Sequence, residues 1–386
     1  MRLNKFLLIL FFPFFFISCE KDNGNGDDDP NLEPIILSGS QSSPLVLESL
    51  FNNPARVDYI VQGTWTINAA VTVDRGVRFM MTPGARIDIG SSGSFAAEGT
   101  ADRPIYIEGE ADARGYWDYI RFQSNNPNNI FDHCIISHGG GSSLSNRNGA
   151  IALVGNAQLS VSNSVIRESQ RNGIIVTSTD NRLPVFENNT ITGCEMFPIK
   201  IRPQQLSSID VTTDFDSGNG FNKIEVDGTT VSTALAINKV SGPYLFTGTI
   251  SLNGATEIEP GTYIEMGPGA RIEVRSTGSL AIVGTANDPI VITGEQNAKG
   301  YWDFIYYNDT NSPNNIIQHA DISYGGGSSL SSRNGMISAR ANTFLAMGNS
   351  SITNSMRYGI TIGSGVNWEN QGGNVFSGNE LGDIND

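Results

Sequence analysis

The sequence predicts an all-β chain that is wound as a parallel solenoid and contains an internal duplication. Runs of strand length alternate apolar with polar residues and are separated by Gly, Asn, Ser or Pro; examples are "ARIDI", "DYIRF", "QLSVS" and "PIKI". A period of two with almost no sustained helical period indicates strands. A constant shift between two parts of the chain indicates that the whole pattern occurs twice.

The duplication is read directly from matching segments. "TPGARIDIGSSGSFAAEGTADRPIYIEGE", which starts at Thr82, pairs with "GPGARIEVRSTGSLAIVGTANDPIVITGE", which starts at Gly267, at a shift of 185. "GYWDYI" pairs with "GYWDFI" at the same shift, and one inserted residue then makes the shift 186. The two copies cover roughly 60–200 and 245–386. Differences between the copies therefore show what each position tolerates.

Two all-β architectures compete, an antiparallel sandwich and a parallel solenoid. Hairpin signals such as a two-residue "NG" between alternating runs are rare, whereas Asn and Gly recur beside strand ends in "VSNSVI", "ENNTITG" and "GNSSITN". Asn side chains that hydrogen-bond their equivalents in adjacent coils fit a parallel stack. The turns therefore favour the solenoid.

Composition and charge restrict the partners. The chain has 386 residues, of which 43 are Gly and 16% are charged, as is typical of a β-rich secreted or surface protein. The formal charge of −15 becomes −17 once Arg2 and Lys5 are removed with the N-terminal signal. A basic surface that neutralises phosphates is absent from such a composition, so nucleic acid is not an expected partner.

Residues 1–18 are predicted to be a lipoprotein signal peptide. Arg2 and Lys5 precede an apolar run that is too short to span a bilayer, and the run ends in "FISC". This ending resembles a bacterial lipoprotein signal, in which cleavage leaves Cys19 as the lipidated N-terminus; an ordinary signal peptide with an incidental Cys is the alternative. Residues 19–36 read as an acidic flexible tether, and "EKD" after the Cys resembles the surface-export signal of Bacteroidota lipoproteins. We expect an outer-membrane lipoprotein that is exposed at the cell surface.

The folded part resembles a known family. "PGARIDI…GSFAAEGTADRPIYIEGE…GYWDYIRF…NNIFDHCIISHGG…LSVSNSVIRES" is similar to the right-handed parallel β-helix proteins found as lipoproteins in Bacteroidota, and the pattern occurs twice. The resemblance implies a right-handed parallel β-helix, with the first copy and its connecting coils in 37–233 and the second copy in 234–386. Such helices include polysaccharide lyases and hydrolases, phage tailspike enzymes, adhesins and many proteins without an assigned activity, so the fold does not fix the function.

Strand parity separates core from surface positions. In "WDYIRF" the pattern places Ile120 and Phe122 inward and Tyr119 and Arg121 outward. Cys134 pairs with an Ala in the second copy, which is typical of a small buried position, and it and Cys194 form no CxxC or disulfide framework.

The candidate ligand-binding positions come from a loop that occurs twice, as "SHGGGSSLSNRNG" at 137–149 and "SYGGGSSLSSRNG" at 323–335. Each copy is longer than a coil turn needs, so it should bulge from the stack, either as a tolerated flexible loop or as a binding element. Aromatic faces beside planar polar side chains are what sugar rings need. The candidates are Tyr116, Trp117, His133, Arg147 and Asn148 in the first copy, and Tyr301, Trp302, His319, Arg333 and Asn334 in the second.

Two further expectations attach to these candidates. The two His lie at outward parity, where a surface or turn residue competes with a metal ligand or catalytic group. If the shift between the copies is a whole number of coils, the two loops share one face and bind a long polymer bivalently.

Catalytic signals are weak. No HExxH, GxSxG, P-loop or zinc spacing is present, and no metal, cofactor or catalytic residue is assigned. Carboxylates at Asp118 and Asp303 occur in both copies, as do the pairs Glu110 with Glu295 and Glu195 with Glu380. The two Asp residues begin strands, so backbone capping is their expected role. Enzymatic activity stays open, with a non-catalytic protein favoured.

The sequence thus predicts a surface-anchored, non-catalytic β-helix protein that presents repeated loops for adhesion or glycan binding. The expected partners are a polysaccharide or a host or cell-surface glycan, and the outer membrane through the lipid. One alternative is a polysaccharide-degrading lyase or glycoside hydrolase of the same fold, which should show carboxylates and a basic residue converging at one place. The other is a purely structural surface protein.

Overall fold

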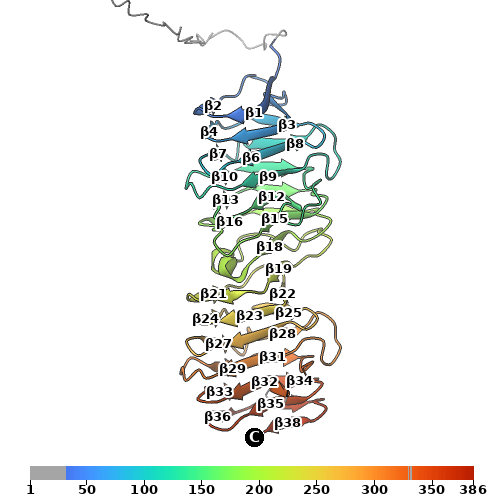
Figure 1. Ribbon diagram of the computed structural model, residues 1–386. Coiled ribbons are helices and arrows are strands. Elements are labelled where there is room, and N and C mark those ends of the chain that lie inside the picture. Colours follow the sequence, from blue (N-terminus) through green and yellow to red (C-terminus); the bar gives the residue numbers. More distant parts are fainter. Residues whose placement is uncertain (1–31, 329, 331–332) are drawn as a thin grey trace, which may run out of the picture.

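The computed structural model is a stack of short parallel strands wound into one elongated β-helix (Figure 1). It describes residues 32–328, 330 and 333–386. The predicted signal peptide, the lipidation site Cys19 and most of the predicted tether lie outside the described residues. The first strand begins at Ile35, at the end of the segment predicted as tether. Within the described part of the chain, no helix is long and apolar enough to cross a membrane.

Each coil of the first copy contributes a first, a second and a third strand, and like strands stack into faces 1, 2 and 3. Face 1 contains the first part of β1 (Ile35–Gln41), whose second part lies on face 2, the first part of β3 (Tyr59–Ile67), β5 (Arg78–Met81), β8 (Ile105–Gly109), β11 (Cys134–Ser137), β14 (Val165–Arg167) and β17 (Thr190–Thr192). Face 2 contains the second part of β3, β6 (Arg86–Ile89), β9 (Tyr119–Phe122), β12 (Gly149–Leu153), β15 (Asn172–Val176) and β18 (Ile199–Ile201). Face 3 contains β2 (Leu45–Leu47), β4 (Ala70–Val73), β7 (Ser94–Glu98), β10 (Ile130–Asp132), β13 (Ser160–Ser162) and β16 (Phe186–Glu187).

The second copy repeats this arrangement. Its face 1 contains β22 (Tyr244–Thr247), β25 (Tyr263–Met266), β28 (Ile290–Gly294), β31 (Ala320–Ser323), β34 (Ser351–Thr353) and β37 (Val375–Ser377). Its face 2 contains β23 (Thr249–Leu252), β26 (Arg271–Val274), β29 (Ile305–Asn308), β32 (Gly335–Arg340), β35 (Tyr358–Ile362) and β38 (Gly382–Asn385). Its face 3 contains β24 (Ala255–Ile258), β27 (Ser279–Val283), β30 (Ile316–Gln318), β33 (Phe344–Gly348) and β36 (Asn367–Gly372). Between the copies lie the 3-10 helix η1 (Pro203–Ser208), β19 (Ile224–Asp227), β20 (Thr230–Val231) and β21 (Leu235–Ile237).

The register stacks like side chains and so builds a continuous core. On face 2, Ile87 pairs with Ile120, which pairs with Ile151 in the next coil, and all three are fully buried. Phe122 and Ile305 are fully buried as well, which confirms the predicted inward parity. Burying these stacked apolar side chains supplies the main stabilisation of the solenoid.

Asn side chains connect adjacent coils, but differently from the prediction. The Asn189 side chain accepts a hydrogen bond from the Ser164 amide at 3.0 Å and donates one to the Val161 carbonyl at 3.0 Å. Asn219 bridges the Cys194 amide and the Ile191 carbonyl of the preceding coil in the same way. The Asn residues therefore satisfy turn backbone groups of the neighbouring coil, and the expected bonding to equivalent Asn side chains is wrong for these residues.

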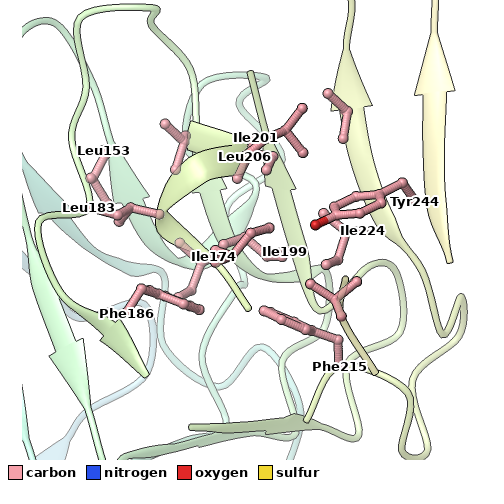
Figure 2. Close-up of a cluster of buried hydrophobic side chains, with 14 of the residues drawn as sticks. Leu153, Ile174, Leu183, Phe186, Ile199, Ile201, Leu206, Phe215, Ile224 and Tyr244 are labelled. Carbon is pink, nitrogen blue, oxygen red and sulfur yellow. The ribbon is translucent and has the colours of Figure 1, made fainter. Parts of the chain in front are cut away.

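The two copies form one continuous helix. Figure 2 shows buried side chains that come from both sides of the junction, including Leu206 of η1, Ile224 of β19 and Tyr244 of β22. Phe186 stacks on Phe215 with ring centroids 6.1 Å apart, which fills the core where η1 replaces a third strand. No break in the core separates the copies, so they fold as parts of one solenoid.

The faces of the two copies are offset at this junction. β18 belongs to face 2 of the first copy and pairs with β19, and β19 pairs with β22, which belongs to face 1 of the second copy. Face 2 of the first copy thus continues as face 1 of the second. A strand or loop of the first copy and its equivalent in the second copy are therefore rotated by one face about the helix axis.

Candidate functional site

The three glycines of the first loop have a packing role. A Cβ on Gly139 would lie 2.6 Å from the Trp117 indole ring, and one on Gly141 would lie 2.6 Å from the Gly115 carbonyl oxygen. Gly140 has a φ of +83°, a conformation that residues with a Cβ adopt only with strain. The loop backbone is held there because the amides of Gly140 and Gly141 donate to the carbonyls of Asp118 and Trp117 at 2.9 and 3.0 Å.

The second copy repeats this packing closely. A Cβ on Gly325 would lie 2.7 Å from the Trp302 ring, and Gly326 has a φ of +84°. Both indoles are fully buried, and each Nε1 donates to a face 1 carbonyl, of Ser137 or Ser323, at 2.8 Å. The prediction that Trp117 and Trp302 present aromatic faces to a ligand is therefore wrong. Their proximity to Tyr116 and Tyr301 in sequence suggested exposure, but their side chains point into the helix and form the floor under each loop.

Arg147 covers the aromatic ring on face 2 of the first copy. Its guanidinium carbon lies 5.5 Å from the Tyr119 ring centroid, and its Nη1 donates to the Tyr119 hydroxyl at 3.0 Å. Tyr119 points outward, as predicted, yet is only 1% exposed because Arg147 and Arg86 lie over it. The outermost group at this position is therefore a guanidinium backed by an aromatic ring.

Arg333 occupies the equivalent place in the second copy. Its guanidinium carbon lies 4.6 Å from the Tyr306 ring and 5.1 Å from the Phe304 ring. A cation–π contact orients the guanidinium; in the first copy the Tyr119 hydroxyl also takes one N–H donor of Arg147, and the Nε atoms of both arginines are buried. Among the predicted ligand-binding residues, the two loop arginines thus lie over outward aromatic rings in both copies.

The charges around the two arginines differ. In the first copy, Asp88 pairs with Arg121 at 2.6 Å. In the second copy Tyr306 replaces Arg121, and Glu273, at the position of Asp88, contacts Arg275 and also lies 3.9 Å from Arg333. Because the second copy has no arginine at the position of Arg121, the Glu273 carboxylate is shared between Arg275 and the loop residue Arg333.

The Asn residues that follow the two loop arginines also differ, because only the one in the second copy has a partner for its side-chain oxygen. The Asn334 side-chain oxygen accepts a hydrogen bond from Arg357 Nη1 at 2.9 Å. In the first copy, the Asn148 side-chain oxygen is buried and has no hydrogen-bond partner among the described residues. Arg171 occupies the position of Arg357, beside Asn148 in the adjoining coil, because Gly149 pairs with Asn172.

The two His residues belong to a different corner. His133 and His319 adopt φ values of 50° and 48° at the turn from face 3 to face 1, where the next coil of each copy has Asn163 and Asn349. β11 separates His133 from the first loop, so the structure does not bring His133 together with Arg147. No group of three or more His, Cys, Asp or Glu side chains is placed to hold a metal ion in the described part of the chain.

The retained carboxylates make side-chain contacts. Asp118 pairs with Arg86 at 3.0 Å and Asp303 with Arg271 at 3.6 Å, so both carboxylates form ion pairs that the expected capping role did not include. Burial raises the pKa of both carboxyls, and the nearby arginine opposes this effect only in part. Tyr116 is half-buried, and its hydroxyl donates to Glu110 at 3.1 Å; the contact from Tyr301 to Glu295 is 3.3 Å.

The two loops do not share a face. Seven strand-to-strand steps separate β12, which follows the first loop, from β31, which precedes the second. At about 4.8 Å a step this amounts to about 34 Å along the axis. Because face 2 of the first copy continues as face 1 of the second, the loops leave the helix at corners one face apart. The condition for bivalent binding on one face is not met.

Sequence reasoning missed a charged cluster at the junction. Lys223, which precedes β19, pairs with Glu265 at 2.5 Å and with Glu295 at 3.1 Å. Burial raises the pKa of Glu225 on the same surface, while Lys200, 3.0 Å away, lowers it. Lys223 lies in the connecting coils, outside the repeated segments, so comparing the copies gave no signal for it.

A pocket at the N-terminal coils was missed as well. Its volume is about 460 Å³. It is lined by Ser49, Phe51, Asn52, Pro54, Gly76, Asp102, Arg103, Pro104 and Tyr106. Arg78 lies 3.7 Å from the Tyr106 ring centroid and occupies one face of that ring. The second copy has Val291 in place of Tyr106.

Comparison with known proteins finds no matching family model, no matching curated protein and no matching solved structure.

Proposed function

We propose that this protein is a non-catalytic β-helix that binds glycans through its duplicated loops at the cell surface, where the predicted lipid on Cys19 holds it. The observation that carries the proposal is the arginine stacked on an outward aromatic ring, which occurs in both copies at Arg147 and Arg333.

The chemistry of this arrangement suits sugars. A guanidinium carries several N–H donors in one plane, and those that are not bonded within the protein can donate to the hydroxyls of a sugar. The loop residues Ser143 to Asn146 are exposed beside it and add hydroxyl and amide groups. The floor of three glycines and a buried Trp fixes the loop's ends, which lowers the entropy lost on binding.

A glycan array with the purified full-length protein tests the proposal. We expect binding to a set of related glycans, lowered at least about tenfold by Arg147→Ala, as for loss of a charge-assisted hydrogen bond. Arg182→Ala is the matched control, since it removes an exposed arginine elsewhere on the first copy. Binding that is unchanged by Arg147→Ala and Arg333→Ala together would contradict the role of the loops.

One observation favours the alternative of a polysaccharide-degrading enzyme. Glu265 and Glu295 converge on Lys223, and a lyase or glycosidase needs carboxylates and a basic group at one place. Incubation with polysaccharides, followed by assays for new reducing ends and unsaturated products, tests this alternative. Cleavage that Glu265→Gln abolishes would replace the binding proposal with an enzymatic one.

A further inference from the structure

Two arginines of the first copy, Arg147 in the loop and Arg171 in the adjoining coil, form no ion pair within the described residues. Within the described residues, no carboxylate oxygen lies within 4.0 Å of a side-chain nitrogen of Arg147 or Arg171. Both side chains are half-buried, and their Nε atoms are buried without a hydrogen-bond partner, as are those of the equivalent Arg333 and Arg357, so the copies differ in the carboxylate and amide partners of these arginines and not in Nε. Partial burial of unpaired cations costs free energy, and a bound anion would offset that cost.

The second loop has internal partners at the equivalent places. Glu273, whose side chain is 6% exposed, lies 3.9 Å from Arg333. Arg357 is bonded to the Asn334 amide oxygen. The second copy therefore has a carboxylate near its loop arginine and a partner for its Asn side-chain oxygen, and the first copy has neither.

The unpaired groups of the first copy match one kind of ligand. Arg147 and Arg171 supply in-plane N–H donors, which bind carboxylate or sulfate oxygens in pairs. The Asn148 side-chain oxygen adds a buried acceptor with no partner, which a sugar hydroxyl satisfies and a simple anion does not. Charge and acceptor together favour an acidic sugar over a neutral sugar or a non-sugar polyanion.

We infer that the first copy alone carries an anionic-glycan subsite, formed by Arg147, Arg171 and Asn148, and that it takes sugar chains bearing carboxylate or sulfate groups. The inference rests on the proposed glycan binding and adds the substrate class and the inequality of the two copies. Glu273 acts as an internal competitor that keeps the second loop from binding the same ligand.

Calorimetry with the full-length protein and four probes tests the inference: a uronic-acid oligosaccharide, a sulfated oligosaccharide, a neutral oligosaccharide of equal length, and polyglutamate. We expect one site per chain for an acidic oligosaccharide and affinity at least about tenfold lower for the neutral one. Arg147→Ala and Arg171→Ala should each lower acidic-glycan affinity at least about tenfold. Arg333→Ala should lower it much less than Arg147→Ala does, and the control Arg182→Ala, at an exposed arginine away from both loops, should leave it unchanged.

A gain-of-function variant keeps the test independent of folding defects. Glu273→Gln removes the competing carboxylate, so the number of acidic-glycan sites per chain should rise from one to two. A stoichiometry that stays at one in this variant would overturn the role of Glu273 as the internal competitor. Equal losses from Arg147→Ala and Arg333→Ala in the natural chain would overturn the inequality of the copies. Binding of polyglutamate as tight as that of the acidic glycan would overturn the sugar specificity.

The failures of the two proposals are distinguishable. Neutral-glycan binding that equals acidic-glycan binding overturns the subsite and leaves glycan binding in place. Absence of binding to all three oligosaccharides overturns glycan binding and the subsite together.

Discussion

Gly139→Ala tests why the loop begins with three glycines. The added Cβ would lie 2.6 Å from the Trp117 ring, well inside ordinary carbon–carbon contact at about 3.5–4.0 Å. Neither partner moves easily, because the indole is bonded to the Ser137 carbonyl and the adjoining Gly140 amide to the Asp118 carbonyl. Overpacking of this kind costs about 1–3 kcal/mol, so urea unfolding should begin at a lower concentration in the variant.

Two companion variants identify the cause. Gly155→Ala is the control, because Gly155 has a φ of +67° and no atom within 4 Å of its added Cβ, so it reports backbone strain alone. Trp117→Phe removes the contacted part of the indole, so the cost of Gly139→Ala should fall by about 1 kcal/mol or more in that background. Equal costs of Gly139→Ala in both backgrounds would refute the packing explanation.

The remaining predictions concern the core, the anchor and pH. Ile120→Asp should leave the chain largely unfolded, because the fully buried position offers no partner for a charge; a normal circular dichroism spectrum and melting curve would contradict the inward assignment. Cys19→Ala should abolish lipid labelling and release the protein from membranes, and persistent membrane association would mean that the lipoprotein signal is misread. The raised pKa of Asp118 means that the folded state keeps its proton to higher pH than the unfolded chain, so this carboxyl's favourable contribution is lost as pH rises through the folded pKa. The stability of the natural chain relative to Asp118→Asn should therefore increase as pH is lowered from 7 toward the ordinary Asp range of about 3.9, and a decrease measured by thermal unfolding would show that the Arg86 pair dominates instead.

Strand parity predicted the fold and the core but not the accessibility of the site. Period-two patterning fixes which side of a strand a residue occupies, and it placed Ile120 and Tyr119 correctly. It carries no information on whether another segment covers an outward residue, as Arg147 covers Tyr119. Trp117 precedes its strand, so strand parity did not predict whether its side chain points inward. Its inward position accounts for the glycine at 139, where a Cβ would contact the indole ring.

The offset between the copies was hidden for a related reason. A shift in residue number converts to an angle round the helix only if every coil has the same length, and the connecting coils here vary. η1 takes the place of a third strand, and β19 joins the second strand of one coil to the first strand of another. The pairing partners of β19 could be known only from three-dimensional structure. The same holds for the ion pair of Glu273 with Arg333, which depends on the absence of an arginine at Tyr306.

Hydrogen exchange with and without a bound acidic oligosaccharide locates the anionic-glycan subsite without any substitution. We expect slower exchange of backbone amides in the first loop, at 142–149, and in the adjoining turn at 170–172, with no change in the corresponding parts of the second copy. Protection confined to the surface around Lys223, or equal protection of both loops, would contradict it.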